Sequence, residues 1–155
     1  MVAGTRWGRF PAEAKKMTTD KQKPLYILSI SVHGLIRGSD LELGRDPDTG
    51  GQTKYVVELA RALAEAPGVE RVDLLTRRVD DPAVSSDYAA PSEPLSERAE
   101  IRRIPCGPPG YIRKEELWDH LDVLADNALD WLRSLPRLPD LIHSHYADAG
   151  YVGSR

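Results

Sequence analysis

The chain has 155 residues, which is the size of one ordinary domain and too short for two well-built ones. Charged residues make up 29% and apolar residues 41%, a composition typical of a globular protein rather than a disordered or membrane one. The net charge of −3, without basic clusters, argues against nucleic acid as a partner. The longest apolar run, residues 25–32, is too short to span a bilayer, so no membrane partner is expected.

Cysteine and histidine usage excludes the common metal sites. Cys106 is the only cysteine, so neither an internal disulfide nor a cysteine-based zinc site can form within the chain. No metal-binding spacing joins the four histidines, which are His33, His120, His143 and His145. We therefore expect no metal.

Residues 1–23 are basic and polar, with few side chains that could pack. They lack the apolar core and small cleavage residues of a secretory signal. We interpret them as a flexible extension before a globular part, residues 24–155, and expect a cytoplasmic protein. The sequence does not indicate an oligomeric state.

Strand-like and helix-like segments alternate after this extension. Residues 25–32 form a nearly continuous apolar run, typical of a buried strand, and residues 33–49 are polar without periodicity. Residues 50–66 are predicted to form an amphipathic helix, and residues 69–76 a second strand. The apolar stripe of this helix consists of Tyr55, Val56, Leu59, Ala60 and Leu63.

The second half continues the alternation. Residues 80–98, rich in Asp, Ser, Pro and Glu, are predicted to be an exposed surface loop, and residues 100–104 a third strand. Residues 113–135 are predicted to form a second long helix, and residues 138–143 a fourth strand. The stripe of the second helix consists of Leu117, Leu121, Leu124, Ala128, Leu129 and Leu132.

This alternation predicts an α/β fold with an open, parallel, Rossmann-like sheet, because strands separated by helices pair in parallel through crossovers. Asp148 has the character of a helix N-cap, yet only a few residues follow it. We therefore expect an incomplete, partial N-terminal domain, residues 24–155, of a longer protein.

The first candidate site is the start of the first predicted helix. In open parallel sheets, ligands bind beyond the carboxyl ends of the strands, and the long connection before Gly50 lies at that edge. Gly50 and Gly51 allow a ligand to approach the backbone, and free helix N–H groups favour an anion. Gln52 adds an amide for a sugar hydroxyl or a phosphate. The alternative is that Asp48 or Thr49 merely caps the helix. Neither a Walker loop nor a dinucleotide motif is present.

The second candidate site is residues 143–148, at the carboxyl end of the fourth predicted strand. Strand alternation places His143 and His145 on the same side, with Ser144 opposed. We expect one ring to be buried against the sheet and the other to reach the crevice, where an imidazole can hold a sugar hydroxyl or stabilise charge. The alternative is that both are hydrogen-bonded structural histidines.

Other candidates carry less weight. His33, with Gly34, is interpreted as a structural residue at the end of the first strand, and Cys106 as unsuited to be a nucleophile because no base is near in sequence. Five basic residues near the ends of the first two predicted strands and the first helix are interpreted as solvated charges, namely Arg37, Arg45, Lys54, Arg77 and Arg78.

Six ordered blocks together closely resemble the start of the sucrose-phosphate synthase family, and sucrose synthase and other family 4 glycosyltransferases share parts of the pattern. The resemblance runs from residue 24 to the end of the chain. The blocks are residues 30–38 (ISVHGLIRG), 42–52 (ELGRDPDTGGQ), 54–63 (KYVVELARAL), 103–107 (RIPCG), 111–118 (YIRKEELW) and 139–150 (PDLIHSHYADAG).

The resemblance implies a retaining glycosyltransferase with two Rossmann-like domains, the GT-B arrangement. Such an enzyme transfers glucose from UDP-glucose to fructose 6-phosphate, giving sucrose 6-phosphate, without a metal or other cofactor. The chain corresponds to the acceptor-side domain, and the C-terminal nucleotide-sugar domain is absent from it. By motif position, Gly50, Gly51 and Gln52 are substrate-binding residues, and His145 is a catalytic histidine of the cleft. Because one domain cannot close on itself, this fragment alone is expected to be inactive.

One departure from the family pattern keeps alternatives open. Family members commonly carry a basic residue for the acceptor phosphate just before Tyr111, whereas residues 107–110 are uncharged here, and the nearest cations are Arg113 and Lys114. The alternatives are sucrose synthase or a related hexosyltransferase with another acceptor, and a non-catalytic module that binds sugar phosphates.

Overall fold

The computed structural model describes residues 23–155. The flexible extension predicted for residues 1–23 lies outside the described residues, apart from Lys23. No helix in the described part of the chain is long and apolar enough to cross a membrane.

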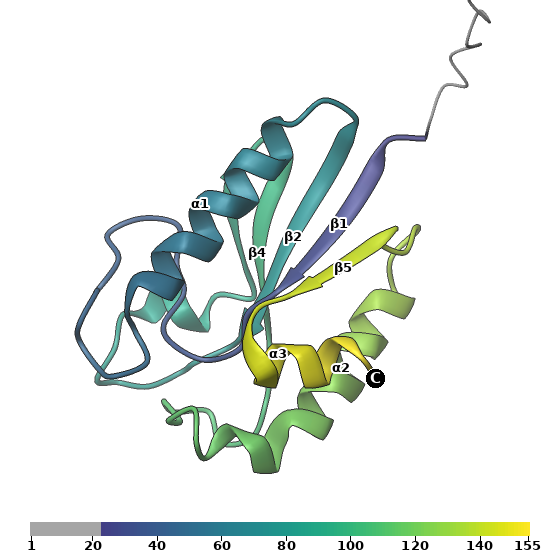
Figure 1. The fold of residues 1–155 in the computed structure, drawn as a ribbon. Coiled ribbons are helices and arrows are strands. Elements are labelled where there is room, and N and C mark those ends of the chain that lie inside the picture. The colour runs from purple at the N-terminus through teal and green to yellow at the C-terminus, as the bar shows by residue number, and fades with distance from the viewer. Residues whose placement is uncertain (1–22) are drawn as a thin grey trace, which may run out of the picture.

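One five-stranded sheet forms the centre of the fold (Figure 1). The strands span Leu25–Ile30 (β1), Val69–Arg77 (β2), Ser92–Ser96 (β3), Ala99–Ile104 (β4) and Leu141–Ser144 (β5). Their spatial order is β3-β4-β2-β1-β5, in which β4, β2, β1 and β5 are parallel and β3 pairs antiparallel with β4. The predicted α/β fold with a Rossmann-like sheet is confirmed, with the antiparallel edge strand as an addition.

Helix α1, Gly51–Glu65, covers one face of this sheet (Figure 1). Its fully buried positions pack with apolar residues of β1, β2 and β4 in one cluster, because they recur at helical spacing. Val56 and Ala60 of the predicted stripe are buried, whereas Tyr55 is exposed, because it lies at the margin of the stripe.

Helices α2 (Leu121–Arg133) and α3 (Tyr146–Gly153) lie on the opposite face (Figure 1). The second helix was predicted from residue 113, but only a short 3₁₀ turn, η2 (Leu117–His120), precedes α2. The physical reason is that residues 113–116 supply no apolar side chain for a helical face. Leu129 of the predicted stripe is also exposed.

The prediction of an exposed loop for residues 80–98 is wrong in two places. A 3₁₀ turn, η1 (Ser86–Ala89), buries Tyr88 against Leu35 and Val79 in a third apolar cluster. The edge strand β3 then pairs with β4. A single aromatic residue within a polar stretch leaves no periodicity from which to predict either feature.

Asp148 is not the helix N-cap that the sequence suggested. α3 begins at Tyr146 with His145 as its N-cap, so Asp148 lies in the first turn and is buried. Its carboxylate is free to contact a partner from another element.

Arg77 does not face water, as the sequence suggested, but is buried. Its guanidinium donates hydrogen bonds to the carbonyls of Cys106 (2.9 Å), Pro108 and Gly110 (2.7 Å). Burial lowers the pKa of Arg77. The side chain therefore holds the segment that follows β4.

Candidate functional site

The carboxyl ends of β1 and β5 lie side by side, since Ser29 pairs with His143 and Ile30 with Ser144 in parallel register. His145 N–H extends this pairing to the carbonyl of Ile30 (2.9 Å). Residues 31–50 leave β1 at the same edge and lead into α1 (Figure 1). This edge is where a parallel sheet positions a ligand.

No side chain caps the start of α1. Gly50 is the N-cap without a side-chain cap, so neither Asp48 nor Thr49 caps the helix, contrary to the alternative considered from the sequence. Among residues 23–155, the backbone N–H groups of Gly51 and Gln52 have no acceptor. These unpaired donors, at the positive end of the helix dipole, suit an anion.

The backbone does not require glycine at these two positions. Gly50 has a φ of −120°, Gly51 has no positive φ, and a Cβ at either residue would meet nothing within 4 Å. By contrast, Gly34 has a φ of +83°, and a Cβ there would lie 2.6 Å from the carbonyl oxygen of Asp48. The open space over Gly50 and Gly51 is available to a ligand.

Gln52 is held close to the sheet. Its Nε2 donates to the Ser31 hydroxyl (2.9 Å), and Ser31 follows β1 directly. The amide therefore lies between the helix start and the end of β1, where it is half-buried.

His145 is buried and its Nε2 lies 3.0 Å from the Ser29 hydroxyl. Tyr55 of α1 contacts the ring edge to face, with 5.4 Å between ring centroids. His143 is exposed, with its ring centroid 4.4 Å from that of His145. Both rings thus lie on the same side of the chain, as predicted, one buried and one accessible.

Burial, and then the proximity of His143, lower the pKa of His145. The neutral ring therefore predominates at neutral pH, so His145 can accept or donate a hydrogen bond but does not supply a positive charge.

The pair of His33 and Asp148 was missed in the sequence analysis. The Nδ1 of His33 lies 2.7 Å from Oδ2 of Asp148, and both side chains are buried. The Tyr146 ring contacts His33 edge to face, with 5.2 Å between ring centroids. The signal that could have found the pair is the position of each residue just beyond a strand end, once β1 and β5 are known to be neighbours.

These contacts bring the predicted residues together. Gln52 contacts Ser31, which lies two residues before His33, and Tyr55, one turn further along α1, contacts His145. We call the group of Gly50, Gly51, Gln52, His33 and His145 the rim. Their placement at one edge is a structural finding, whereas their roles toward a substrate stay predictions.

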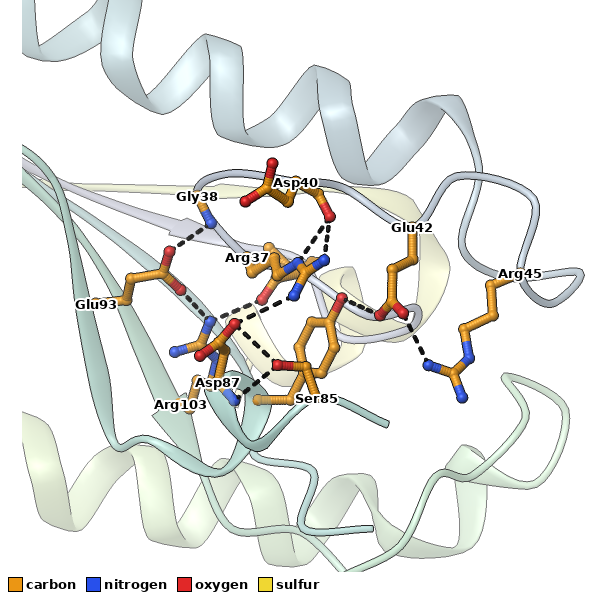
Figure 2. Close-up of polar contacts among 11 residues, drawn as sticks. Arg37, Gly38, Asp40, Glu42, Arg45, Ser85, Asp87, Glu93 and Arg103 are labelled. Carbon is orange, nitrogen blue, oxygen red and sulfur yellow. Dashed lines mark hydrogen bonds and ion pairs between the residues drawn. The ribbon is translucent and has the colours of Figure 1, made fainter. Parts of the chain in front are cut away.

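The connection between β1 and α1 is fixed by charged contacts (Figure 2). Arg37 donates to the carbonyl of Asp40 and pairs with Asp87 (3.1 Å), and Arg45 pairs with Glu42 (3.0 Å). These arginines were interpreted as solvated charges, but they hold the loop.

Figure 2 also shows Glu93 between this loop and β4. Its carboxylate accepts hydrogen bonds from the N–H of Gly38 (2.7 Å) and from Arg103, whose side chain is fully buried. Arg103 also donates to the carbonyl of Ile36 (3.0 Å). The edge strand β3 thus anchors the loop that leads to the rim.

Comparisons with known proteins identify the family. The chain is 49% identical over 160 residues to a probable sucrose-phosphate synthase 1 of Oryza sativa subsp. indica, across 87% of this chain and 15% of the rice protein. It is 50% identical over 156 residues to a probable sucrose-phosphate synthase 2 of Arabidopsis thaliana, across 84% of this chain and 15% of that protein. This chain belongs to the sucrose-phosphate synthase family.

A solved sucrose-phosphate synthase from Thermosynechococcus elongatus has a similar fold, with a TM-score of 0.67 at 30% identity. The match covers 84% of this chain and 29% of that one. No family model matches the sequence. The chain spans about 15% of the length of the curated sucrose-phosphate synthases that it matches.

A small pocket of about 240 Å³ lies beside the rim. His33 and Asp148 line it together with Lys114, Trp118 and Tyr146. The two aromatic side chains and Lys114 are exposed, so the pocket offers flat apolar surfaces and a cation. Lys114 Nζ lies 4.0 Å from Asp48 Oδ1.

Two further observations concern chemistry away from the rim. Cys106 is buried and burial raises its pKa, which disfavours the thiolate that a nucleophile needs. No group of three or more His, Cys, Asp or Glu that could hold a metal ion occurs among the residues that the structure describes. The expectation that no metal is needed stays a prediction.

Proposed function

We propose that this chain is the acceptor-side part of a retaining glycosyltransferase that moves glucose from UDP-glucose to fructose 6-phosphate, giving sucrose 6-phosphate and UDP. The observation that carries the proposal is the 49% identity to a sucrose-phosphate synthase over 87% of the chain. The rim supports it, because both substrates carry phosphate and sugar hydroxyls.

The rim residues have distinct roles in this proposal. The free N–H groups of Gly51 and Gln52 bind phosphate oxygens, and the absence of a Cβ on Gly50 and Gly51 lets the substrate reach them. The neutral His145 ring holds a sugar hydroxyl near the reacting carbon, and Ser29 fixes its orientation. The leaving phosphate is then stabilised by donors already in place, which lowers the barrier to transfer.

A second domain is needed to complete the site. Transfer requires donor and acceptor to be pressed together away from water, whereas the rim lies open at one edge of a single sheet. We infer that a nucleotide-sugar domain elsewhere in the full-length protein closes over the rim. A cytoplasmic location and independence from metals are further parts of the proposal.

One observation favours a second candidate acceptor. Residues 107–110 are uncharged, and the carbonyls of Pro108 and Gly110 accept from the buried Arg77 rather than from a ligand. An enzyme with this feature could use free fructose, as sucrose synthase does, unless Lys114 supplies the charge for the acceptor phosphate.

The test is an assay of the full-length protein with UDP-glucose, comparing kcat/KM for fructose 6-phosphate with kcat/KM for fructose. A phosphate-binding acceptor site should favour fructose 6-phosphate by roughly 10²-fold, as expected for one or two charge-assisted hydrogen bonds. A preference for fructose would support the second candidate. Binding of both sugars without transfer would instead support a non-catalytic module.

A further inference from the structure

His33 and Asp148 are 115 residues apart and form one buried unit at the rim. The side chains of His33 and Asp148 are 8% and 5% exposed, and the 2.7 Å contact joins ring Nδ1 to the carboxylate. A buried carboxylate is costly unless it is paired, so this contact fixes the ring as well as the acid.

The neighbours of His33 determine which way the ring faces. Asp148 takes Nδ1, so Nε2 is the ring nitrogen that this pair leaves open, and the Gln52 amide lies near the ring. Tyr146 contacts the ring edge to face, with 5.2 Å between centroids. Tyr146 itself has a φ of +69°, a left-handed conformation that is strained for an aromatic residue.

The charges around His33 come from three elements. α3 contributes Asp148 and the phenol of Tyr146, the connection before α1 contributes Asp48, and the segment before η2 contributes Lys114 and Glu115. α1 contributes only the neutral amide of Gln52 at this ring.

The balance of these groups favours the charged imidazole. Burial alone would lower the pKa of His33, but the hydrogen bond and charge of Asp148, with smaller effects of Gln52 and Asp48, raise it above its ordinary value of 6.5. Because the pKa of the neighbouring His145 is lowered, the two histidines of the rim are shifted in opposite directions.

We propose that Asp148 is a positioning residue that fixes the His33 ring at the rim, where His33 and Lys114 line one pocket, so that His33 contributes a hydrogen-bond donor to the phosphate of a sugar-phosphate or nucleotide ligand. Asp148 acts only through His33. This inference rests on the proposed function, because it names a donor that the phosphate-binding edge would use.

The test uses the full-length protein and the Asp148→Asn variant, with Asp130→Asn on the exposed face of α2 as the matched control. Asparagine keeps a hydrogen-bond acceptor for Nδ1 but removes the charge. The charged form of His33 is lost as pH rises through its pKa, so kcat/KM should fall on the alkaline side. In Asp148→Asn this fall should move about one pH unit lower, giving roughly tenfold lower kcat/KM near pH 8 and little change near pH 6.

A purely structural Asp148 would lower activity equally at all pH values, and an unmoved alkaline fall would overturn the inference. If Asp148→Asn fails to fold, His33→Gln decides the question. Loss of the alkaline fall in that variant supports the inference, and its retention overturns it.

Calorimetric binding of UDP and of fructose 6-phosphate across the same pH range separates this inference from the proposed function. If the wild-type protein performs no transfer, the proposed function fails, whereas pH-dependent binding that weakens in Asp148→Asn still supports the inference. The ligand whose affinity changes identifies the phosphate that His33 contacts. Affinity for both ligands that is independent of pH between 6 and 9 overturns it.

Discussion

Glycine has two different roles around the carboxyl edge of the sheet. Gly34 is required by the fold, since its φ is +83° and a side chain would collide with the carbonyl of Asp48. Gly50 and Gly51 face open space in ordinary backbone conformations. Glycine costs helix stability relative to alanine, so its presence at an unconstrained helix start is better explained by a ligand than by folding.

Gly51→Ala should therefore separate stability from function. We expect the free energy of unfolding to stay the same or rise by up to about 1 kcal/mol, because alanine restricts the unfolded chain. We expect kcat/KM to fall by roughly tenfold or more, because the methyl group blocks approach to the N–H groups. Steady-state kinetics and urea unfolding of the full-length protein measure both quantities.

Two further glycine variants serve as references for that prediction. Gly150→Ala, in α3, also meets open space and should leave kcat/KM unchanged. Gly34→Ala should instead destabilise the fold by about 1–3 kcal/mol. Normal kinetics in Gly51→Ala would show that Gly51 serves only the turn before α1 and has no role in substrate binding.

His145 is the second residue on which the account depends. Its ring is neutral, buried and oriented by Ser29, which suits hydrogen bonding in a transition state. His145→Ala should lower kcat by roughly 10²-fold with intact folding, whereas His120→Ala, in η2, should leave kcat nearly unchanged. Gln52→Ala is expected to behave like His145→Ala. Near-normal turnover with folded protein would make both residues structural.

At the scale of elements, the sequence predicts the helices and strands whose apolar residues form a continuous run or recur with a regular period. β1, α1, β2 and β4 were predicted within a few residues, because continuous apolar runs and helical stripes mark buried elements. α2 was predicted too early, because Arg113 to Glu116 were included although the apolar stripe begins only at Leu117. β3 was missed, because Pro94 and the polar residues around it look like a loop, and pairing with β4 is a tertiary effect.

The edge strand β3 has a structural consequence for the rim, through Glu93. Glu93→Gln removes the charge that accompanies the fully buried Arg103, and it weakens the bond to Gly38. We expect the free energy of unfolding to fall by about 1–3 kcal/mol, because the arginine is left without a charged partner. Thermal unfolding measures this effect. Glu97→Gln, at an exposed residue in the turn that follows β3, should have no effect, and equal stability of the two variants would show that the Glu93 contact contributes nothing.

At the scale of the whole molecule, the candidate site depends on the strand order. Parallel pairing of β1 with β5 places Ser29 beside His143, and therefore His33 near Asp148. Sequence reasoning predicted that the glycine pair and His145 share this edge, because both follow strand ends. It could not predict the His33–Asp148 pair, because neither the adjacency of β1 and β5 nor the start of α3 at Tyr146 is marked by local spacing.

The polar residues of the rim gather at one end of the sheet, while the apolar clusters fill its two faces. A charged group of a ligand at this end would meet unpaired helix N–H groups, a buried imidazole and the exposed Lys114. The fold therefore gathers groups suited to a phosphate at one edge of the sheet, and phosphate binding at this edge is the central claim of the account.

The most direct test of this claim is a crystal structure of the full-length protein with UDP and fructose 6-phosphate. The account predicts a phosphate oxygen at about 3 Å from the N–H of Gly51 or Gln52, and a sugar hydroxyl at hydrogen-bond distance from His145. Both ligands bound elsewhere, with the start of α1 and His145 facing only solvent, would contradict it.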